Sequence, residues 1–329
     1  MSALTIARRL RDALVLFWLV ISLTFVLLRL APGDPATMLV PPDASPAMAA
    51  RLRHDFGLDA PLPVQYARWL GETLTGHLGE SFAAHEPVTR VIGRAASLSL
   101  GLGLASLALT FLIGVPIGML QGARRGGAWD WTLTVLTTAV YASPTFWIAL
   151  ALVALFTYGA SMLGFPAWLR LPAFGVQTPG AMLSGFAAVR DVIRHAVLPV
   201  AILAGVGAAG VARYARSNVA DVMRQDFVRT ARAKGASAWR VFGRHVLANV
   251  LPALVVLFAL VLPGLVAGSI FVESVFAWPG LGRTMLSAIG ARDYPVVMAS
   301  TMLYAGAVIV ANLAADLAIP WFDPRRAQE

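Results

Sequence analysis

The sequence predicts an all-α membrane protein whose chain crosses the bilayer six times. Apolar residues make up 58% of the 329 residues and the mean hydropathy is +0.72, whereas soluble domains are roughly 45–50% apolar. The formal charge of +9 is unevenly distributed among the loops, as expected for an oriented membrane protein. We therefore expect lipid around the chain and no nucleic-acid partner.

Six segments are apolar for about the 20 residues that a helix needs to cross a hydrocarbon core. The expected spans are residues 13–31, 97–120, 131–158, 196–213, 246–271 and 296–321. The first follows the basic start ARRLRDA, but no small-residue cleavage site comes after it, so we interpret it as an uncleaved anchor. The absence of cysteine excludes disulfides and thiolate chemistry.

The distribution of basic residues predicts the orientation. With the N-terminus inside the cell, the cytoplasmic segments hold 15 basic and six acidic residues, and the outer segments hold 11 basic and ten acidic residues. Cytoplasmic loops of membrane proteins are enriched in Lys and Arg. Both termini are therefore predicted to be cytoplasmic.

The long outer segment, residues 32–95, is predicted to contain short amphipathic helices. Ser45-Pro46, Pro63 and Glu86-Pro87 each stand where a helix would begin, and the last would run into the second span. Such helices either cover the ends of the spans or dock a soluble partner. We divide the chain into an anchor with this outer segment, residues 1–95, and a core membrane domain, residues 96–329.

The chain carries no recognised catalytic motif. Its single lysine, Lys234, follows Ala233 and not the glycine of a phosphate-binding P-loop. No nucleophile elbow or zinc-binding H-E-x-x-H pattern is present. We expect no enzymatic activity, no cofactor site and no metal site in this chain.

A carboxylate within the last span is the clearest intramembrane polar group. Charges in a bilayer cost roughly 2.5–3.5 kcal/mol on insertion scales and mark functional candidates. Asp316 lies one turn beyond Asn312, and its expected partner is Arg213 or Arg216. The group is either a structural ion pair or the proton site of an ion-coupled secondary carrier.

The third span contains the sequence YASPTFW, where a proline-induced kink is tolerated, because Ser143 and Thr145 can satisfy the backbone carbonyl that the proline frees. Tyr141, Ser143, Thr145 and Trp147 either line a translocation path or pack against neighbouring helices. The glycine-rich stretches GLGLASLALTFLIG and LAGVGAAGVA predict close helix packing.

The basic loop at residues 217–247 is predicted to fold as two helices joined by a glycine elbow. Ser217 or Asn218 would cap the first helix, Gly235 would end it in a left-handed conformation, and Ser237 would cap the second. A DNA-binding helix-turn-helix is excluded because the flanking spans leave no room to follow a groove. The loop is either an ordinary positive-inside loop or a rigid elbow for a cytoplasmic protein.

The segment DFVRTARAKGASAWRVFGRHVLANVLP resembles the EAA-type loop of ABC importer permeases of the oligopeptide/dipeptide/nickel type. The resemblance extends to LLRLAPGDPATMLV, which is similar to the PGDP signature of the first of two permeases, and to DFGLDAPLPVQYARWLGETLTGHLGES in the outer segment. It continues in order through RHAVLPVAIL, FVESVFAWPGLGRTML, RDYPVV and NLAADLAIPWFDPRR. Two departures are that Thr230, Ala231 and Arg232 replace the glutamate-containing EAA triplet, and that GRAASLSL lacks Pro-Ala-Thr.

The resemblance implies a type I importer permease in the bacterial inner membrane. The implied partners are a second, homologous permease that completes a heterodimer, two ATPase subunits that bind ATP and Mg, and an extracytoplasmic substrate-binding protein. The loop would then be the coupling helix that docks on an ATPase. The residues implied in docking are Phe227, Arg229, Ala231, Arg232, Lys234 and Gly235. The sequence does not distinguish a peptide substrate from a nickel chelate, glutathione or another small solute.

Overall fold

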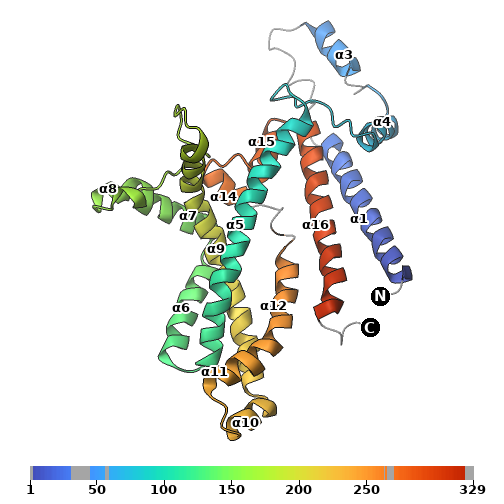
Figure 1. Ribbon diagram of the computed structural model, residues 1–329. Coiled ribbons are helices and arrows are strands. Elements are labelled where there is room, and N and C mark those ends of the chain that lie inside the picture. Colours follow the sequence, from blue (N-terminus) through green and yellow to red (C-terminus); the bar gives the residue numbers. More distant parts are fainter. Residues whose placement is uncertain (1–2, 31–44, 56–58, 263, 265–269, 323–329) are drawn as a thin grey trace. The chain divides into compact units, whose positions relative to one another are not determined.

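The computed structural model describes residues 3–30, 45–55, 59–262, 264 and 270–322, and in this part of the chain the fold is helical (Figure 1). Within these ranges, the only β-type pairing is an isolated bridge between Glu80 and Pro87. The predicted all-α class is confirmed. Contacts group the chain into two units: Met1–Leu98 with Gly280–Ile309, and Ser99–Pro279 with Val310–Glu329.

In the described part of the chain, six helices have the length and apolar composition needed to cross a membrane, as the sequence predicted. They are Ile6–Leu30, Val88–Ala123, Thr145–Met162, Gly185–Met223, Ala238–Val261 and Tyr294–Ala314. Several are longer than expected, because the helices continue beyond the apolar window into polar sequence. The predicted division of the chain at residue 95 remains a prediction.

The first unit holds α1 (Ala3–Leu30), the outer helices and α15 (Leu281–Gly290). The predicted outer helices are present as α3 (Pro46–Asp55) and α4 (Leu62–Leu74), and Ser45 Oγ accepts a hydrogen bond from the Met48 amide at 3.3 Å. The start of α5 (Val88–Ala123) follows Pro87 directly. The PGDP signature, residues 32–35, lies outside the described residues.

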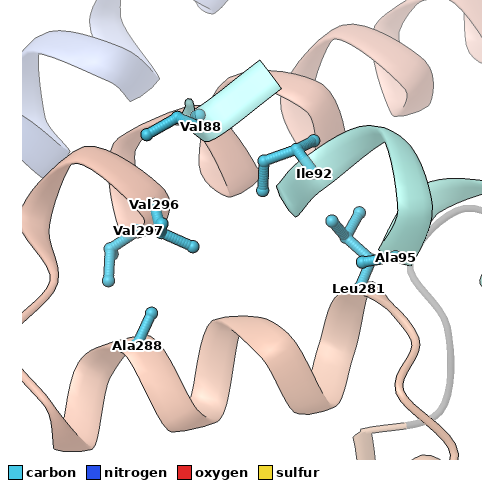
Figure 2. Packing of buried hydrophobic residues seen from close by; sticks show 8 residues of the cluster. Val88, Ile92, Ala95, Leu281, Ala288, Val296 and Val297 are labelled. Carbon is cyan, nitrogen blue, oxygen red and sulfur yellow. The ribbon is translucent and has the colours of Figure 1, made fainter. Parts of the chain in front are cut away.

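A hydrophobic cluster joins the two sequence segments of this unit. Figure 2 shows Val88 and Ile92 of α5 facing Val296 and Val297 of α16 (Tyr294–Phe322), with α15 completing the enclosure. Leu281 of α15 is also buried in it. Residues nearly 200 positions apart therefore share one core.

The second unit is built around α9 (Gly185–Met223), which packs closely against α5. A Cβ atom on Gly118 would lie 2.3 Å from the Ala212 carbonyl oxygen, and one on Gly114 would lie 2.7 Å from the Ala208 oxygen. Gly122 meets Val219 in the same way. Small residues at such positions let helix backbones touch, which confirms the close packing predicted from glycine.

The third predicted span, residues 131–158, is broken at Ser143 and Pro144 and is not one continuous helix. α6 (Ala128–Ala142) ends before Ser143, and α7 (Thr145–Val153) begins after Pro144. Ser143 and Pro144 are both extended, with ψ of 138° and 129°. A residue before proline is disfavoured in the helical region, so the chain leaves the helix there. After α7, a π-helical turn, Ala154–Tyr158, leads into α8 (Gly159–Met162).

The fifth predicted span, residues 246–271, is only partly described. A π-helical segment, Val241–Val246, leads into α12 (Leu247–Val261), and α14 (Ile270–Val275) follows. Residues 263 and 265–269 lie outside the described part of the chain. The continuous helix therefore begins earlier than predicted, with α11 (Ala238–Arg240).

Candidate functional site

The predicted elbow is present between α9 and α12, but its first helix begins later than expected (Figure 1). α9 continues through Ser217 and Asn218, and Asn218 Nδ2 donates to the Tyr214 carbonyl oxygen at 2.9 Å instead of capping a helix. The cap predicted at these two residues is wrong, because α9 keeps a buried apolar face as far as Val222. The elbow helix is α10 (Asp226–Ala233), preceded by Gln225.

The glycine turn is a Schellman motif. The Gly235 amide donates to the Arg232 carbonyl oxygen at 2.9 Å, and the Ala236 amide donates to the Ala231 oxygen at 3.1 Å. Gly235 has a φ of +79°, so the left-handed conformation predicted for it is confirmed. Ser237 then caps α11, because its Oγ accepts from the Arg240 amide at 3.4 Å.

One buried side chain anchors α10 to the membrane helices. Val228 is fully buried among Val219 and Val222 of α9 and Val241 and Val246 of the π-helical segment. Burying a valine contributes roughly 1.5–3 kcal/mol relative to exposure. The elbow is therefore attached to the ends of two helices at once.

The predicted docking residues divide between the exposed surface and this cluster. Phe227, Arg229, Arg232, Lys234 and Gly235 are exposed, whereas Ala231 is half-buried and packs against the Val228 cluster. The Arg229 side chain is 75% exposed and makes a 3.4 Å contact with Asp226. Such an exposed pair contributes little to stability. The exposed surface of α10 and the residue after it thus presents three cations, the Asp226 carboxylate and one aromatic ring.

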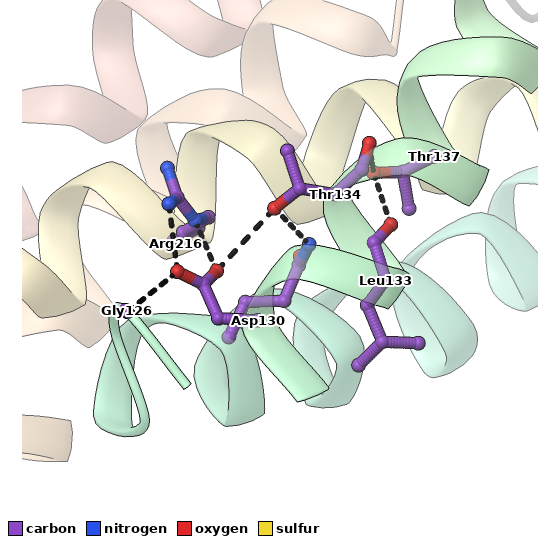
Figure 3. Close-up of polar contacts among 7 residues, drawn as sticks. Gly126, Asp130, Leu133, Thr134, Thr137 and Arg216 are labelled. Atoms are coloured by element: carbon purple, nitrogen blue, oxygen red, sulfur yellow. Dashed lines mark hydrogen bonds and ion pairs between the residues drawn. The ribbon is translucent and has the colours of Figure 1, made fainter. Parts of the chain in front are cut away.

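An ion pair fixes the start of α6 to α9 in the same unit (Figure 3). Arg216 Nε donates to Asp130 Oδ1 at 2.6 Å and a terminal guanidinium nitrogen donates to Oδ2 at 2.9 Å. The Gly126 amide and the Thr134 hydroxyl also donate to this carboxylate, at 2.9 and 3.3 Å. These donors, the Arg216 guanidinium above all, lower the pKa of Asp130 from 3.8 to about 2.

The residues predicted to line a path gather at the break between α6 and α7. Tyr141 lies on the last turn of α6 and Trp147 on the first turn of α7, and both are exposed. Ser143 Oγ donates to the Ala139 carbonyl oxygen at 2.7 Å, which satisfies the end of α6, and Thr145 opens α7. Their role in a path remains a prediction.

The predicted intramembrane pair is only partly visible. The Arg213 guanidinium lies 4.8 Å from the centre of the Tyr141 ring, in a cation–π contact. Arg216, the other expected partner of Asp316, is bound to Asp130 instead. Asn312 is exposed on α16, and the side chain of Asp316 lies outside the described residues.

Comparison with known protein families shows to which family this chain belongs. A model described as "Binding-protein-dependent transport system inner membrane component" matches residues 114–328, and the model of the corresponding N-terminal region matches residues 3–103. The chain belongs to this family of transport permeases. It is a permease subunit of an ABC importer and a multi-pass inner-membrane protein, and the family works with ATPase and substrate-binding partners.

Curated relatives and solved structures agree with this permease assignment. The chain is 37% identical over 326 residues to the oligopeptide transport system permease protein AppB of Bacillus subtilis, covering 99% of both chains. It is 36% identical to the di/tripeptide transport system permease protein DppB of Pseudomonas aeruginosa, covering 97% of both. A structure of the MetNI methionine ABC transporter shares the fold at 18% identity, with a TM-score of 0.52 over 71% of this chain and 97% of that one. The secondary-carrier alternative receives no support.

Two buried carboxylates of the permease were missed by sequence reasoning. Asp293 accepts from Ser81 Oγ at 2.5 Å and from the Ala83 amide at 3.1 Å, within the first unit. Glu273 is fully buried and accepts from Ser99 Oγ at 2.7 Å, within the second. Asp293 stands two residues before Pro295, at the start of a helix, and that spacing is a readable N-cap signal.

Proposed function

We propose that this permease forms half of a translocation path for peptides and receives its driving motion through the α10–α11 elbow. The observation that carries the proposal is the anchoring of Val228 between α9 and the π-helical segment, with the charged face of α10 left exposed. A rigid, outward-facing helix of this kind transmits a push from a docked subunit directly to the spans.

The exposed face of α10 has the chemistry for docking on an acidic cleft. Arg229, Arg232 and Lys234 offer guanidinium and ammonium donors to carboxylate or carbonyl groups of an ATPase subunit. Phe227 supplies an aromatic anchor, and nothing lies within 4 Å of the position of a Cβ atom on Gly235. Ala231 faces inward and contributes by packing α10 against the Val228 cluster.

The energy would come from outside the chain. Two ATPase subunits bind ATP and Mg and hydrolyse ATP, and this subunit is non-catalytic. Closure of the ATPases would draw the elbows together and favour the outward-open state, because a ligand shifts a two-state equilibrium only through its differential affinity for the two states. A second, homologous permease completes the heterodimer, and both termini of this chain are cytoplasmic.

The break between α6 and α7 is our candidate for the path wall. It exposes Tyr141 and Trp147 beside the hydroxyl groups of Ser143 and Thr145. Aromatic rings and hydroxyls suit peptide bonds and side chains of mixed polarity. Asn312 and Asp316 on α16 are secondary candidates, with Arg213 as the proposed partner of Asp316.

Peptides are the proposed substrate class because the relatives named above are oligopeptide and di/tripeptide permeases. Selection among peptides would rest with the extracytoplasmic binding protein, which delivers the ligand to the path. The ligand that co-purifies with that binding protein identifies the substrate directly.

Replacing Gly235 tests the coupling role of the elbow. Valine at a φ of +79° is strained by roughly 1–3 kcal/mol, so the Schellman turn should open and displace α10. In proteoliposomes holding the complete transporter, Gly235→Val should lower ATP-driven peptide uptake at least about tenfold while hydrolysis continues. Gly235→Asn is the matched control, since asparagine tolerates the left-handed region, and it should retain most uptake.

Normal coupled uptake by an inserted Gly235→Val variant would contradict the proposal. A separate measurement addresses the energy source. Uptake by this chain alone, driven by a proton gradient and abolished by Asp316→Asn, would replace the ATP-coupled function with a secondary carrier.

A further inference from the structure

A cavity of about 320 Å³ lies in the first unit, and none of its lining residues belongs to the elbow or to the α6–α7 break. It is bounded by α1, α4, the start of α16 and the loop at residues 77–85. Its volume falls in the range of ligand pockets, about 300–1,000 Å³. Neither the coupling mechanism nor the proposed path uses it.

The floor of the cavity is apolar and is made by membrane-crossing helices. Phe25 and Leu28 of α1 face it from one side, and Met298 and Met302 of α16 from the other. Both helices are candidate spans, and these residues lie near the ends of the spans that meet the outer segment. The floor therefore opens at the depth where lipid acyl chains meet their headgroups.

The rim carries charges of both signs. Arg29 at the end of α1 and Arg68 of α4 line the cavity together with Glu72 of α4 and Glu80 of the loop. Arg29 is oriented by a cation–π contact, with its guanidinium carbon 5.3 Å from the centre of the Phe25 ring. The formal charges of these four residues sum to zero. Such a rim matches a ligand that carries both a negative phosphate and a positive ammonium group.

α4 has the features of a helix lying in the membrane interface. Trp69 stacks on Phe25 with ring centres 5.2 Å apart, and the Tyr66 hydroxyl is hydrogen-bonded to Ser22 Oγ at 2.6 Å. Leu62 and Leu74 of α4 are 45% and 79% exposed. Tryptophan and tyrosine concentrate at membrane–water interfaces, and exposed leucines on an interfacial helix insert among lipids.

We propose that this cavity binds one zwitterionic phospholipid. One acyl chain lies on the floor against Phe25 and Met298, the phosphate is held by Arg29 and Arg68, and the ammonium faces Glu72. A phospholipid fits better than a peptide, because the apolar floor is made by two spans and lies at bilayer depth. Bound there, the lipid fills the gap between α1 and α16 under the amphipathic helix α4.

Native mass spectrometry of the full-length chain, purified with its associated subunits, tests the site. The probes are phosphatidylethanolamine and phosphatidylglycerol, each titrated into delipidated protein in detergent. One tight site that prefers phosphatidylethanolamine is expected. The double variant Arg29→Gln/Arg68→Gln should weaken it at least about tenfold, because charge-assisted bonds to phosphate are among the strong ones. Arg51→Gln/Arg90→Gln is the matched control, since both arginines are exposed in the same outer region and do not line the cavity.

The cavity-filling variant Met302→Trp supplies an independent readout, because it obstructs the floor without changing charge. It should also abolish the tight site, and the exposed Arg68 can be tested alone if the double variant folds poorly. Unchanged lipid affinity in Met302→Trp and Arg68→Gln would overturn the proposal. So would preference for phosphatidylglycerol, equal loss in the Arg51/Arg90 control, or a retained peptide in place of lipid.

Discussion

Asp130, Glu273 and Asp293 are the least exposed carboxylates among the described side chains, and each accepts at least one hydrogen bond from a hydroxyl or guanidinium group. Burying a charge is costly unless it is paired and hydrogen-bonded. The Asp130 carboxylate accepts hydrogen bonds from Arg216, Gly126 and Thr134. Replacing Asp130 therefore tests how much one buried carboxylate contributes to stability.

Asp130→Asn should destabilise the permease by about 2–3 kcal/mol, because it leaves the guanidinium of Arg216 without its carboxylate. This loss of stability is no larger than the smallest losses seen when fully buried ion pairs are broken, because the Arg216 side chain is 30% exposed. Thermal unfolding in detergent measures the loss. The double variant Asp130→Asn/Arg216→Gln should be less destabilised than the two single changes added together, and strict additivity would contradict a direct pair.

The pH dependence of the stability difference between wild type and Asp130→Asn follows from the lowered pKa of Asp130. Because the folded pKa, about 2, lies below the ordinary 3.8, the pair's contribution is fully present above roughly pH 5 and is lost as pH falls through 2. The gap in melting temperature between wild type and Asp130→Asn should thus stay constant from pH 8 to pH 5. A gap that closes near neutral pH would assign the effect to another group.

Local signals in the sequence are sufficient to predict the helix-ending turn at Gly235 and the cap at Ser237, because both depend on only a few neighbouring residues. They are insufficient to predict the ion pair of Asp130 with Arg216, since these residues are 86 positions apart and meet only after α6 and α9 pack. The span predicted for residues 131–158 leaves Asp130 in a loop, and the partner predicted for Asp316 is Arg213 or Arg216. Long-range pairing of charges depends on packing that periodicity does not specify.

Among the elements, α5 and α9 approach each other closely along one face of α5. Gly114, Gly118 and Gly122 recur every four residues on α5 and so lie on one face. Each meets a backbone oxygen or a side chain of α9 at less than 3 Å from a would-be Cβ. This face is where an added methyl group has no room.

Gly118→Ala should destabilise the permease by about 2–3 kcal/mol, because the new methyl collides with the Ala212 carbonyl, which is backbone and cannot move aside alone. Gly101→Ala, also in α5, has nothing within 4 Å of the added carbon and should be neutral or stabilise by up to about 1 kcal/mol. Melting temperatures of the two purified variants measure the contrast. Equal effects would show that the α5–α9 contact does not hold as described.

Two irregular elements could not be predicted from the periodicity of the sequence. Residues 131–158 were expected to form one span, but two extended residues separate α6 from α7. In the second helix of the elbow, Trp239, Phe242 and Val246 follow an α-helical spacing in the sequence, yet Trp239 is 87% exposed. The π-helical segment there brings Val241 and Val246, five residues apart, to the buried face. An α-helical period cannot predict that register.

For the whole molecule, the length of the apolar segments is enough to predict that six helices of the described part can cross a bilayer, because crossing requires long apolar helices whatever their packing. The outer helices were also predictable from proline and serine at their starts. The packing of Val88 and Val296 in one core could not be predicted, since neither local sequence indicates which distant segment it contacts.

The predicted orientation can be tested cleanly because the chain has no cysteine. Ala84→Cys and Arg125→Cys each place a single thiol at an exposed position, the first in the outer segment and the second in the loop between α5 and α6. A membrane-impermeant maleimide should label Ala84→Cys in intact spheroplasts and Arg125→Cys only in inverted vesicles. The reverse pattern would place both termini outside the cell.

The core shared by α5, α15 and α16 has a consequence for biosynthesis. Val88 and Ile92 emerge from the ribosome early, but their partners Val296 and Val297 are among the last residues to be made. At about 5–20 residues per second, the N-terminal third waits roughly 10–40 s for those partners. During that interval the ribosome, the insertion machinery or a chaperone must shield its apolar surface, and a nascent chain stalled before residue 280 would expose it to quality-control proteases.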